Sequence, residues 1–285
     1  MTETWTVRAL LVWARDWLAK KGVESPRLDA ELLLAHALGC SRTRLYVDFD
    51  KPLSPEELAR VKPLLQRRAQ REPVAYILGV REFYGRPFRV RRGVFIPRPE
   101  TELLVQLAVE ALRPGAYVLD LCAGSGAVGV SIAAELPGAR VDLVELSAEA
   151  AAVARENAEA IAPGHTRVFE GDLFAALPQA TNYDAIVANP PYVAETARER
   201  LAPEIVAHEP HQALFAANGG RAVIERIVAE AGRWLAAGGL LALEIDPVLS
   251  AFVSERFTES GFSRVRVVKD LAGFDRHVLG NAPES

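Results

Sequence analysis

From residue 116 to residue 245, short apolar runs alternate with longer stretches of helical periodicity. The apolar runs predict strands near 116–122, 140–145, 166–171, 183–188 and 240–245. Helical patterns lie near 102–112, 127–136, 147–162 and 220–236. Because parallel strands need crossover helices, this alternation predicts an α/β fold with a mostly parallel sheet covered on both faces. The same sheet is completed by a predicted helix at 247–257 and strands near 264–268 and 277–279.

A glycine-rich segment follows the first predicted strand. It consists of Cys122, Ala123, Gly124, Ser125 and Gly126. Glycines permit tight turns and close approach of a ligand, and the helix that follows offers free N–H groups. A third glycine, Gly129, stands where a dinucleotide fingerprint would have one, so the loop alone leaves a nicotinamide cofactor open.

The next predicted strand ends in a carboxylate, Glu145, about 20 residues after the glycine loop. An acid at this place typically binds the hydroxyl groups of a ribose. Since nicotinamide and adenosyl cofactors both carry a ribose, Glu145 predicts a nucleoside ligand without distinguishing the two.

The fourth strand of the pattern ends at Asn189, Pro190, Pro191 and Tyr192. The Asn189 side-chain oxygen and a nearby carbonyl offer acceptors for both hydrogens of a planar NH2 group, while the prolines stiffen the loop. Tyr192 offers a ring that can stack on such a group. The plainer interpretation is a strand stopped by proline. In a doubly wound sheet, this segment and the glycine loop reach the same crevice, so ligand and reacting nitrogen could meet there.

The N-terminal part of the chain has a different pattern. Helical spacing covers residues 6–20 and 28–38, and a third helix begins at Ser54, with Glu57 completing a capping box. Glycines and β-favouring residues from Pro73 onward predict a β-hairpin. We therefore predict a helical domain over residues 1–72, a β-hairpin linker over 73–97 and the α/β domain over 98–285.

Composition and charge limit the possible functions. The net charge of −4 lacks the basic balance common in proteins that bind duplex phosphates. Cys40 and Cys122 are far apart, which argues against a disulfide framework, and no leader or long apolar span is present, so a cytoplasmic protein is expected. His208 and His211 flank a proline and lack a third ligand nearby, which argues against a metal site.

Two sets of motifs carry a family resemblance. The segment 120–126, Glu145 and the segment 189–192 resemble motifs of class I S-adenosylmethionine-dependent methyltransferases that act on planar nitrogens. A longer match resembles the PrmC/HemK family, the peptide chain release factor glutamine methyltransferases. It rests on Tyr76–Gly79, Glu82–Gly85, Val94–Glu102 and Glu209–Leu214. The resemblance covers nearly the whole chain and implies a Rossmann-like, seven-stranded class I domain preceded by a small helical substrate-recognition domain.

The same resemblance implies the reaction. A methyl group would pass from S-adenosylmethionine to the side-chain amide nitrogen (N5) of the glutamine in the Gly-Gly-Gln loop of class 1 release factors, leaving S-adenosylhomocysteine. Residues 122–126 would hold the methionine part of the cofactor, Glu145 the ribose, and Asp172 with Leu173 the adenine. The family usually has Asp at the ribose position, one methylene shorter than Glu145.

The resemblance also implies the residues that would hold the substrate. Asn189 and the Pro190 carbonyl would bind the NH2 group, Pro191 and Tyr192 would shape the pocket, and Asn189 would also border the cofactor. Catalysis would rest on Asn189, Pro190 and Tyr192, without a metal. The role of Arg98 and Glu100 stays open between a surface ion pair and support of the site.

Two other functions fit part of the sequence. A nucleic-acid methyltransferase acting on the exocyclic N6 of adenine or N2 of guanine would use the same pocket for an extruded base. A non-enzymatic translation accessory protein would use the helical domain and would not bind S-adenosylmethionine. The acidic balance and the long family match favour the glutamine methyltransferase, with release factors as partners and no stable binding of nucleic acid or membrane.

Overall fold

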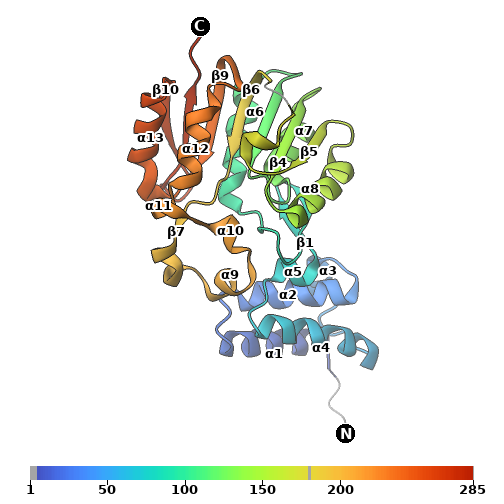
Figure 1. The fold of residues 1–285 in the computed structure, drawn as a ribbon. Coiled ribbons are helices and arrows are strands. Elements are labelled where there is room, and N and C mark those ends of the chain that lie inside the picture. Colours follow the sequence, from blue (N-terminus) through green and yellow to red (C-terminus); the bar gives the residue numbers. More distant parts are fainter. Residues whose placement is uncertain (1–4, 179–180, 285) are drawn as a thin grey trace. The chain divides into compact units, whose positions relative to one another are not determined.

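The computed structural model describes residues 5–178 and 181–284, so the first four residues of the predicted helical domain lie outside it. The chain divides into two compact units. The smaller unit contains the chain up to Gly79 together with Pro203–His208, and the larger contains Val80–Ala202 and Glu209–Ser285. In Figure 1 the blue helices belong to the smaller unit and the sheet belongs to the larger.

Seven strands form the main sheet of the larger unit, in the order β10-β11-β9-β6-β3-β4-β5. Their bounds are β3 (Tyr117–Leu121), β4 (Arg140–Glu145), β5 (Thr166–Glu170), β6 (Tyr183–Ala188), β9 (Leu235–Glu244), β10 (Ser263–Lys269) and β11 (Asp275–Asn281). Neighbouring strands from β5 to β9 are parallel, and β11 is antiparallel to β9 and β10. The predicted α/β fold with a seven-stranded, mostly parallel sheet is confirmed.

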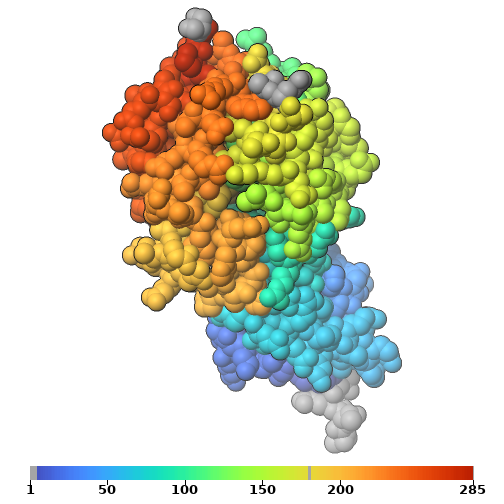
Figure 2. Space-filling model, viewed as in Figure 1, coloured from blue at the N-terminus to red at the C-terminus, as the bar shows by residue number. Residues whose placement is uncertain are grey.

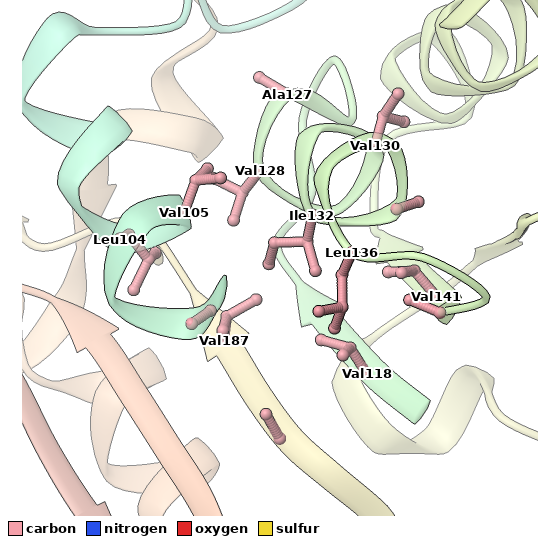
Figure 3. Packing of buried hydrophobic residues seen from close by; sticks show 14 of the residues in the cluster. Leu104, Val105, Val118, Ala127, Val128, Val130, Ile132, Leu136, Val141 and Val187 are labelled. Carbon is pink, nitrogen blue, oxygen red and sulfur yellow. The ribbon is translucent and has the colours of Figure 1, made fainter. Parts of the chain in front are cut away.

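Helices cover both faces of this sheet, as Figure 1 shows. They are α6 (Glu102–Ala111), α7 (Ala127–Glu135), α8 (Ala148–Ile161), α12 (Ala222–Ala231) and α13 (Ser250–Glu259). Because successive strand residues point to opposite faces, β3 contributes Val118 to the core under α6 and α7 and Leu119 to the core under α12 and α13. Figure 3 shows the first of these cores, where Val105 of α6 and Val128 of α7 point toward each other.

The smaller unit is helical. Its elements are α1 (Val7–Lys20), α2 (Pro26–Leu38), α3 (Arg42–Val47), α4 (Pro55–Ala69), α5 (Val74–Leu78) and α9 (Pro203–His208). The capping box expected at the start of α4 is present: the Glu57 N–H donates to Ser54 Oγ at 3.2 Å, and the Ser54 N–H donates to Glu57 Oε2 at 2.9 Å. Leu18, Leu33 and Leu34 are fully buried between the helices.

Ionic contacts hold the distant segment α9 in the smaller unit. Arg68, almost fully buried, donates from Nε to Asp29 Oδ2 at 2.6 Å and from Nη2 to Glu204 Oε1 at 3.3 Å. Arg71 donates to the other oxygen of Glu204. Since an unpaired charge in such a place is costly, removal of either carboxylate, Asp29 or Glu204, should destabilise the smaller unit.

Two predicted elements are corrected by the structure. Residues 74–78, expected within the hairpin, form the one-turn helix α5, because Gly79 takes a left-handed conformation (φ 73°) that ends a helix. The hairpin is confined to β1 (Val80–Phe83) and β2 (Arg86–Arg89). The helix expected over 220–236 ends at Ala231, and β9 begins at Leu235, which pairs with Tyr183. Apolar runs as short as these are compatible with both a helix and a strand, so their spacing does not distinguish the two.

The segment between β6 and α12 contains small elements that the sequence did not predict. β7 (Val193–Ala194) and β8 (Phe215–Ala216) form a parallel pair, followed by α11 (Ala217–Gly220), and α10 (His211–Leu214) precedes β8. Such two-residue strands are too short to carry an alternating pattern.

Among the described residues, no helix is both long enough and apolar enough to span a membrane.

Candidate active site

A cavity lies at the carboxyl ends of the parallel strands in the larger unit. The strand order reverses at β3, which has β4 on one side and β6 on the other, and ligands of open α/β sheets bind at such a point. The cavity has a volume of about 250 Å³. Nine of the twelve predicted site residues line it, from the loops after β3, β4, β5 and β6: Cys122, Ala123, Gly124, Ser125, Glu145, Asp172, Leu173, Asn189 and Pro191.

The other three predicted residues, Gly126, Pro190 and Tyr192, are not part of this lining. Gly126 is the N-terminal cap residue of α7, with a left-handed backbone (φ 81°), and Pro190 is buried. The Tyr192 hydroxyl donates to Oε1 of the buried Glu244 at 3.0 Å, and burial raises the pKa of Tyr192 well above 10. Direct contact of these residues with a substrate therefore stays a prediction.

Glu145 joins the glycine loop to the start of α8. The Gly124 N–H donates to Glu145 Oε2 at 2.8 Å, and the Ser147 N–H donates to Oε1, also at 2.8 Å. Burial raises the pKa of Glu145, while these backbone donors lower it. Each carboxylate oxygen keeps a second lone pair, so Glu145 can still accept hydrogen bonds from a diol.

Asp120 lies beneath the glycine loop, is 1% exposed and lines the cavity. Its Oδ2 accepts from the Gly129 N–H at 2.8 Å. A Cβ at Gly129 would stand 2.9 Å from that oxygen, so glycine is required for this close approach of α7 to β3. Gly129 here serves helix packing rather than direct contact with the cavity.

Asp120 makes stability depend on pH. Burial raises the pKa of Asp120 from 3.8 to about 7, so the folded chain keeps a proton that the unfolded chain has lost. The free energy of unfolding therefore falls as pH rises from about 4 to 7, by up to about 4 kcal/mol for about three pKa units. Asp120→Asn cannot ionise and keeps an acceptor for Gly129. We expect its pH dependence, measured by urea unfolding at pH 5 to 8, to be flatter than that of the unsubstituted chain; parallel curves would contradict this.

The loop after β5 contributes a charged pair to the cavity. Arg226 of α12 donates from Nη2 to Asp172 Oδ2 at 2.8 Å, and both residues are half exposed. Figure 2 shows the yellow-green and orange parts of the larger unit meeting on this face. Leu173 takes a left-handed backbone (φ 49°), which is unusual outside glycine. Nothing in the sequence singled out Arg226.

Asn189 is held by a residue from another part of the chain. Its Nδ2 donates to Thr101 Oγ1 at 3.1 Å, and Thr101 is 3% exposed. Six further lining residues come from segments outside the four strand-end loops: Phe95, Pro97, Thr101, Gln212, Ala213 and Phe215. Most of them lie in the segments 94–102 and 209–214, which the family resemblance had singled out without assigning a function to each residue.

Arg98 and Glu209 connect those two segments. Arg98 donates to Glu209 Oε1, and the Ile96 N–H donates to Glu209 Oε2 at 3.3 Å. Glu209 is only 4% exposed, and the Arg98 guanidinium lies 4.8 Å from the centre of the Phe95 ring. Of the two interpretations left open for Arg98, this contact favours support of the cavity wall.

The chemistry of the cavity is acidic and partly apolar. Asp120, Glu145 and Asp172 contribute carboxyl groups, Arg226 contributes one cation, and Cys122 is a free cysteine whose pKa is raised by burial. Such a cavity suits a ligand with a ribose and a positive charge. Within residues 5–178 and 181–284, no group of three or more His, Cys, Asp or Glu side chains is placed to hold a metal ion.

Comparison with known proteins gives matches over nearly the whole chain. Residues 9–79 match the PrmC N-terminal domain, and residues 91–220 match the methyltransferase small domain. The release factor glutamine methyltransferase of Geobacter sulfurreducens is 44% identical over 278 residues, covering 98% of this chain and 97% of the relative. That of Rhodopirellula baltica is 39% identical over 281 residues, covering 95% of each chain.

A solved structure agrees in fold. The crystal structure of a methyltransferase from Pyrococcus furiosus is similar with a TM-score of 0.54 and 20% identity, covering 79% of this chain and 98% of the other. At this identity the likeness concerns the fold alone.

Proposed function

This chain belongs to the release factor glutamine methyltransferase family, and we propose that it transfers a methyl group from S-adenosylmethionine to the N5 amide nitrogen of the glutamine in the Gly-Gly-Gln motif of class 1 release factors. The observation that carries the proposal is one cavity shared by the glycine loop, Glu145 and Asn189. A nucleoside ligand and an amide can be bound side by side there.

The residues present fit S-adenosylmethionine. Residues 122–126 would hold its methionine part beside the N-terminus of α7, and Glu145 would bind the ribose hydroxyls. Asp172 and Leu173 would border the adenine. When bound, the cofactor supplies a methyl group on a cationic sulfonium, and the carboxylate of Glu145 favours that charge. The product of the cofactor would be S-adenosylhomocysteine.

Asn189 would hold the substrate amide. An amide nitrogen is a poor nucleophile, since its lone pair is delocalised, and its two hydrogens need acceptors. The Asn189 Oδ1 and the Pro190 carbonyl would accept them and turn the lone pair toward the methyl group, with Pro191 and Tyr192 shaping the loop. This role needs no general base before transfer, because positioning lowers the barrier and the proton can leave afterwards.

The helical domain, residues 1–72, would recognise the release factor away from its Gly-Gly-Gln loop. One glutamine offers little area by comparison with protein interfaces of about 1,600 Å². A short peptide that carries Gly-Gly-Gln should therefore be a poorer substrate than the whole factor. The proposal places the enzyme in the cytoplasm, which cell fractionation would test.

Transfer of labelled methyl tests the function. Purified enzyme is incubated with labelled S-adenosylmethionine and a class 1 release factor, the same factor with its Gly-Gly-Gln glutamine replaced, or a nucleic-acid mixture. Label on the intact factor alone is expected. Label on nucleic acid alone would make the enzyme an exocyclic-amine methyltransferase, and failure to bind the cofactor would favour an accessory protein.

Gly220 offers a test of the loop that carries Asn189. A Cβ at Gly220 would stand 2.1 Å from the Tyr192 carbonyl oxygen, whereas one at Gly219 meets nothing within 4 Å. Both glycines have positive φ, so alanine strains the backbone at either position and the comparison isolates the contact. We expect Gly220→Ala to transfer methyl at least about tenfold more slowly than Gly219→Ala, because the loop must shift. Equal rates for the two variants would contradict this account.

A further inference from the structure

The hydrogen bond between Asn189 and Thr101 has a direction that matters for the proposed reaction. Asn189 Nδ2 donates and Thr101 Oγ1 accepts, at 3.1 Å. From this contact we infer that Thr101 is a positioning residue, which fixes the end of the Asn189 amide that faces the substrate. The inference rests on the proposed function of Asn189.

The physical problem is the symmetry of a carboxamide. Its oxygen and nitrogen have similar size, and a half turn about the last side-chain bond exchanges an acceptor for two donors. A substrate NH2 group also presents donors. If Asn189 turned Nδ2 toward it, two N–H donors would face each other and no hydrogen bond could form. In the observed contact, Thr101 Oγ1 accepts from Nδ2, and this hydrogen bond holds the amide in the orientation in which Oδ1 is turned away from Thr101 and toward the substrate.

Thr101 suits this function because its own position is fixed. It is the last residue of the 3-10 turn Pro99–Thr101 and the N-terminal cap residue of α6, and its N–H donates to the Arg98 carbonyl at 3.1 Å. On one side Arg98 is paired with Glu209, and on the other the Tyr84 N–H donates to Glu102 Oε1 at 2.9 Å. The hydroxyl is thus presented by a segment anchored at both ends.

The free end of the amide is also consistent with this assignment. Among the hydrogen bonds of residues 5–178 and 181–284, none is donated to the Asn189 Oδ1. Asn189 and Thr101 both line the cavity, so that oxygen is left available there. The inference has Thr101 act on the substrate through Asn189, so its substitution should change turnover rather than cofactor binding.

Two substitutions separate the hydroxyl from the packing of this side chain. Thr101→Val keeps the branched shape and removes the hydroxyl, whereas Thr101→Ser keeps the hydroxyl and removes the methyl. We expect Thr101→Val to lower kcat for the release factor about tenfold, as loss of one orienting hydrogen bond does, and Thr101→Ser to stay within about threefold. Calorimetry should give both variants the Kd for S-adenosylmethionine of the unsubstituted enzyme.

A double substitution tests whether Thr101 acts through Asn189. In an Asn189→Ala background, Thr101→Val should have little additional effect on kcat, because the group that it orients is gone. A full additional tenfold loss would overturn the inference, as would a normal kcat for Thr101→Val or equal losses for Val and Ser. Should Val not be tolerated by the fold, Thr101→Ala removes the same hydroxyl and is interpreted in the same way.

The unsubstituted enzyme distinguishes this inference from the proposed function. If it transfers no methyl to the release factor, the proposed function fails. If it does transfer methyl and Thr101→Val is equally active, only the positioning inference fails.

Discussion

Replacing Asn189 with alanine is expected to lower the rate of methyl transfer to the release factor by about 100-fold or more, as loss of an oriented polar contact to a transition state does. Alanine removes the acceptor for the substrate amide and leaves Thr101 without its partner. The affinity for S-adenosylmethionine should change far less, because Glu145 and the glycine loop are untouched. Single-turnover kinetics with saturating cofactor would measure the transfer step itself.

The control for this experiment is Asn189→Asp, which keeps the side-chain shape and an acceptor. It should retain more activity than the alanine variant. Methylation by Asn189→Ala at close to the normal rate would remove Asn189 from the mechanism. A fall in cofactor affinity as large as the fall in rate would instead assign Asn189 mainly to cofactor binding.

Glu145→Ala is expected to weaken binding of S-adenosylmethionine by about 100-fold. Loss of two hydrogen bonds to a charged group costs on the order of 3 kcal/mol, and tenfold in Kd corresponds to about 1.4 kcal/mol. The substitution also releases the N–H groups of Gly124 and Ser147, which the carboxylate now accepts. Isothermal titration calorimetry would give the change in Kd directly.

Glu145→Asp is the matched variant, since it shortens the side chain by one methylene and keeps both oxygens. We expect it to bind the cofactor better than Glu145→Ala, because the family resemblance implies that Asp can fill this position. An unchanged Kd for Glu145→Ala would mean that the ribose is bound elsewhere. Thermal unfolding of each variant would show whether the glycine loop still folds.

The sheet could be predicted because its strands are buried and its helices are long. β3, β4, β5 and β6 agree with the sequence to within one residue at each end, since apolar runs bounded by turns leave few alternatives. α5 was missed because its single turn contains β-favouring residues, and only the left-handed Gly79 ends it as a helix. β7 and β8 depend on a pairing across 20 residues, which no local pattern reveals.

The candidate site could be predicted only where a motif and a strand end coincide. The glycine loop, Glu145 and Asn189 follow strands, so the topology of the sheet brings them together. Thr101, Arg226 and the pairing of Arg98 with Glu209 depend on contacts between segments more than 50 residues apart. The contact between Tyr192 and Glu244, 52 residues apart, was not predictable either, and contact of Tyr192 with the substrate stays a prediction.

The smaller unit is built from two segments that lie far apart in the sequence, and this has a consequence for synthesis on the ribosome. Its first five helices, α1 to α5, precede Gly79, but its last helix, α9 (Pro203–His208), follows only after the 123 residues 80–202. At 5–20 residues per second, a nascent chain spends about 6 to 25 s before Glu204 is made. Arg68 and Arg71 cannot form their contacts with Glu204 during that interval. The first part of the chain to emerge is therefore among the last to reach its final set of interactions.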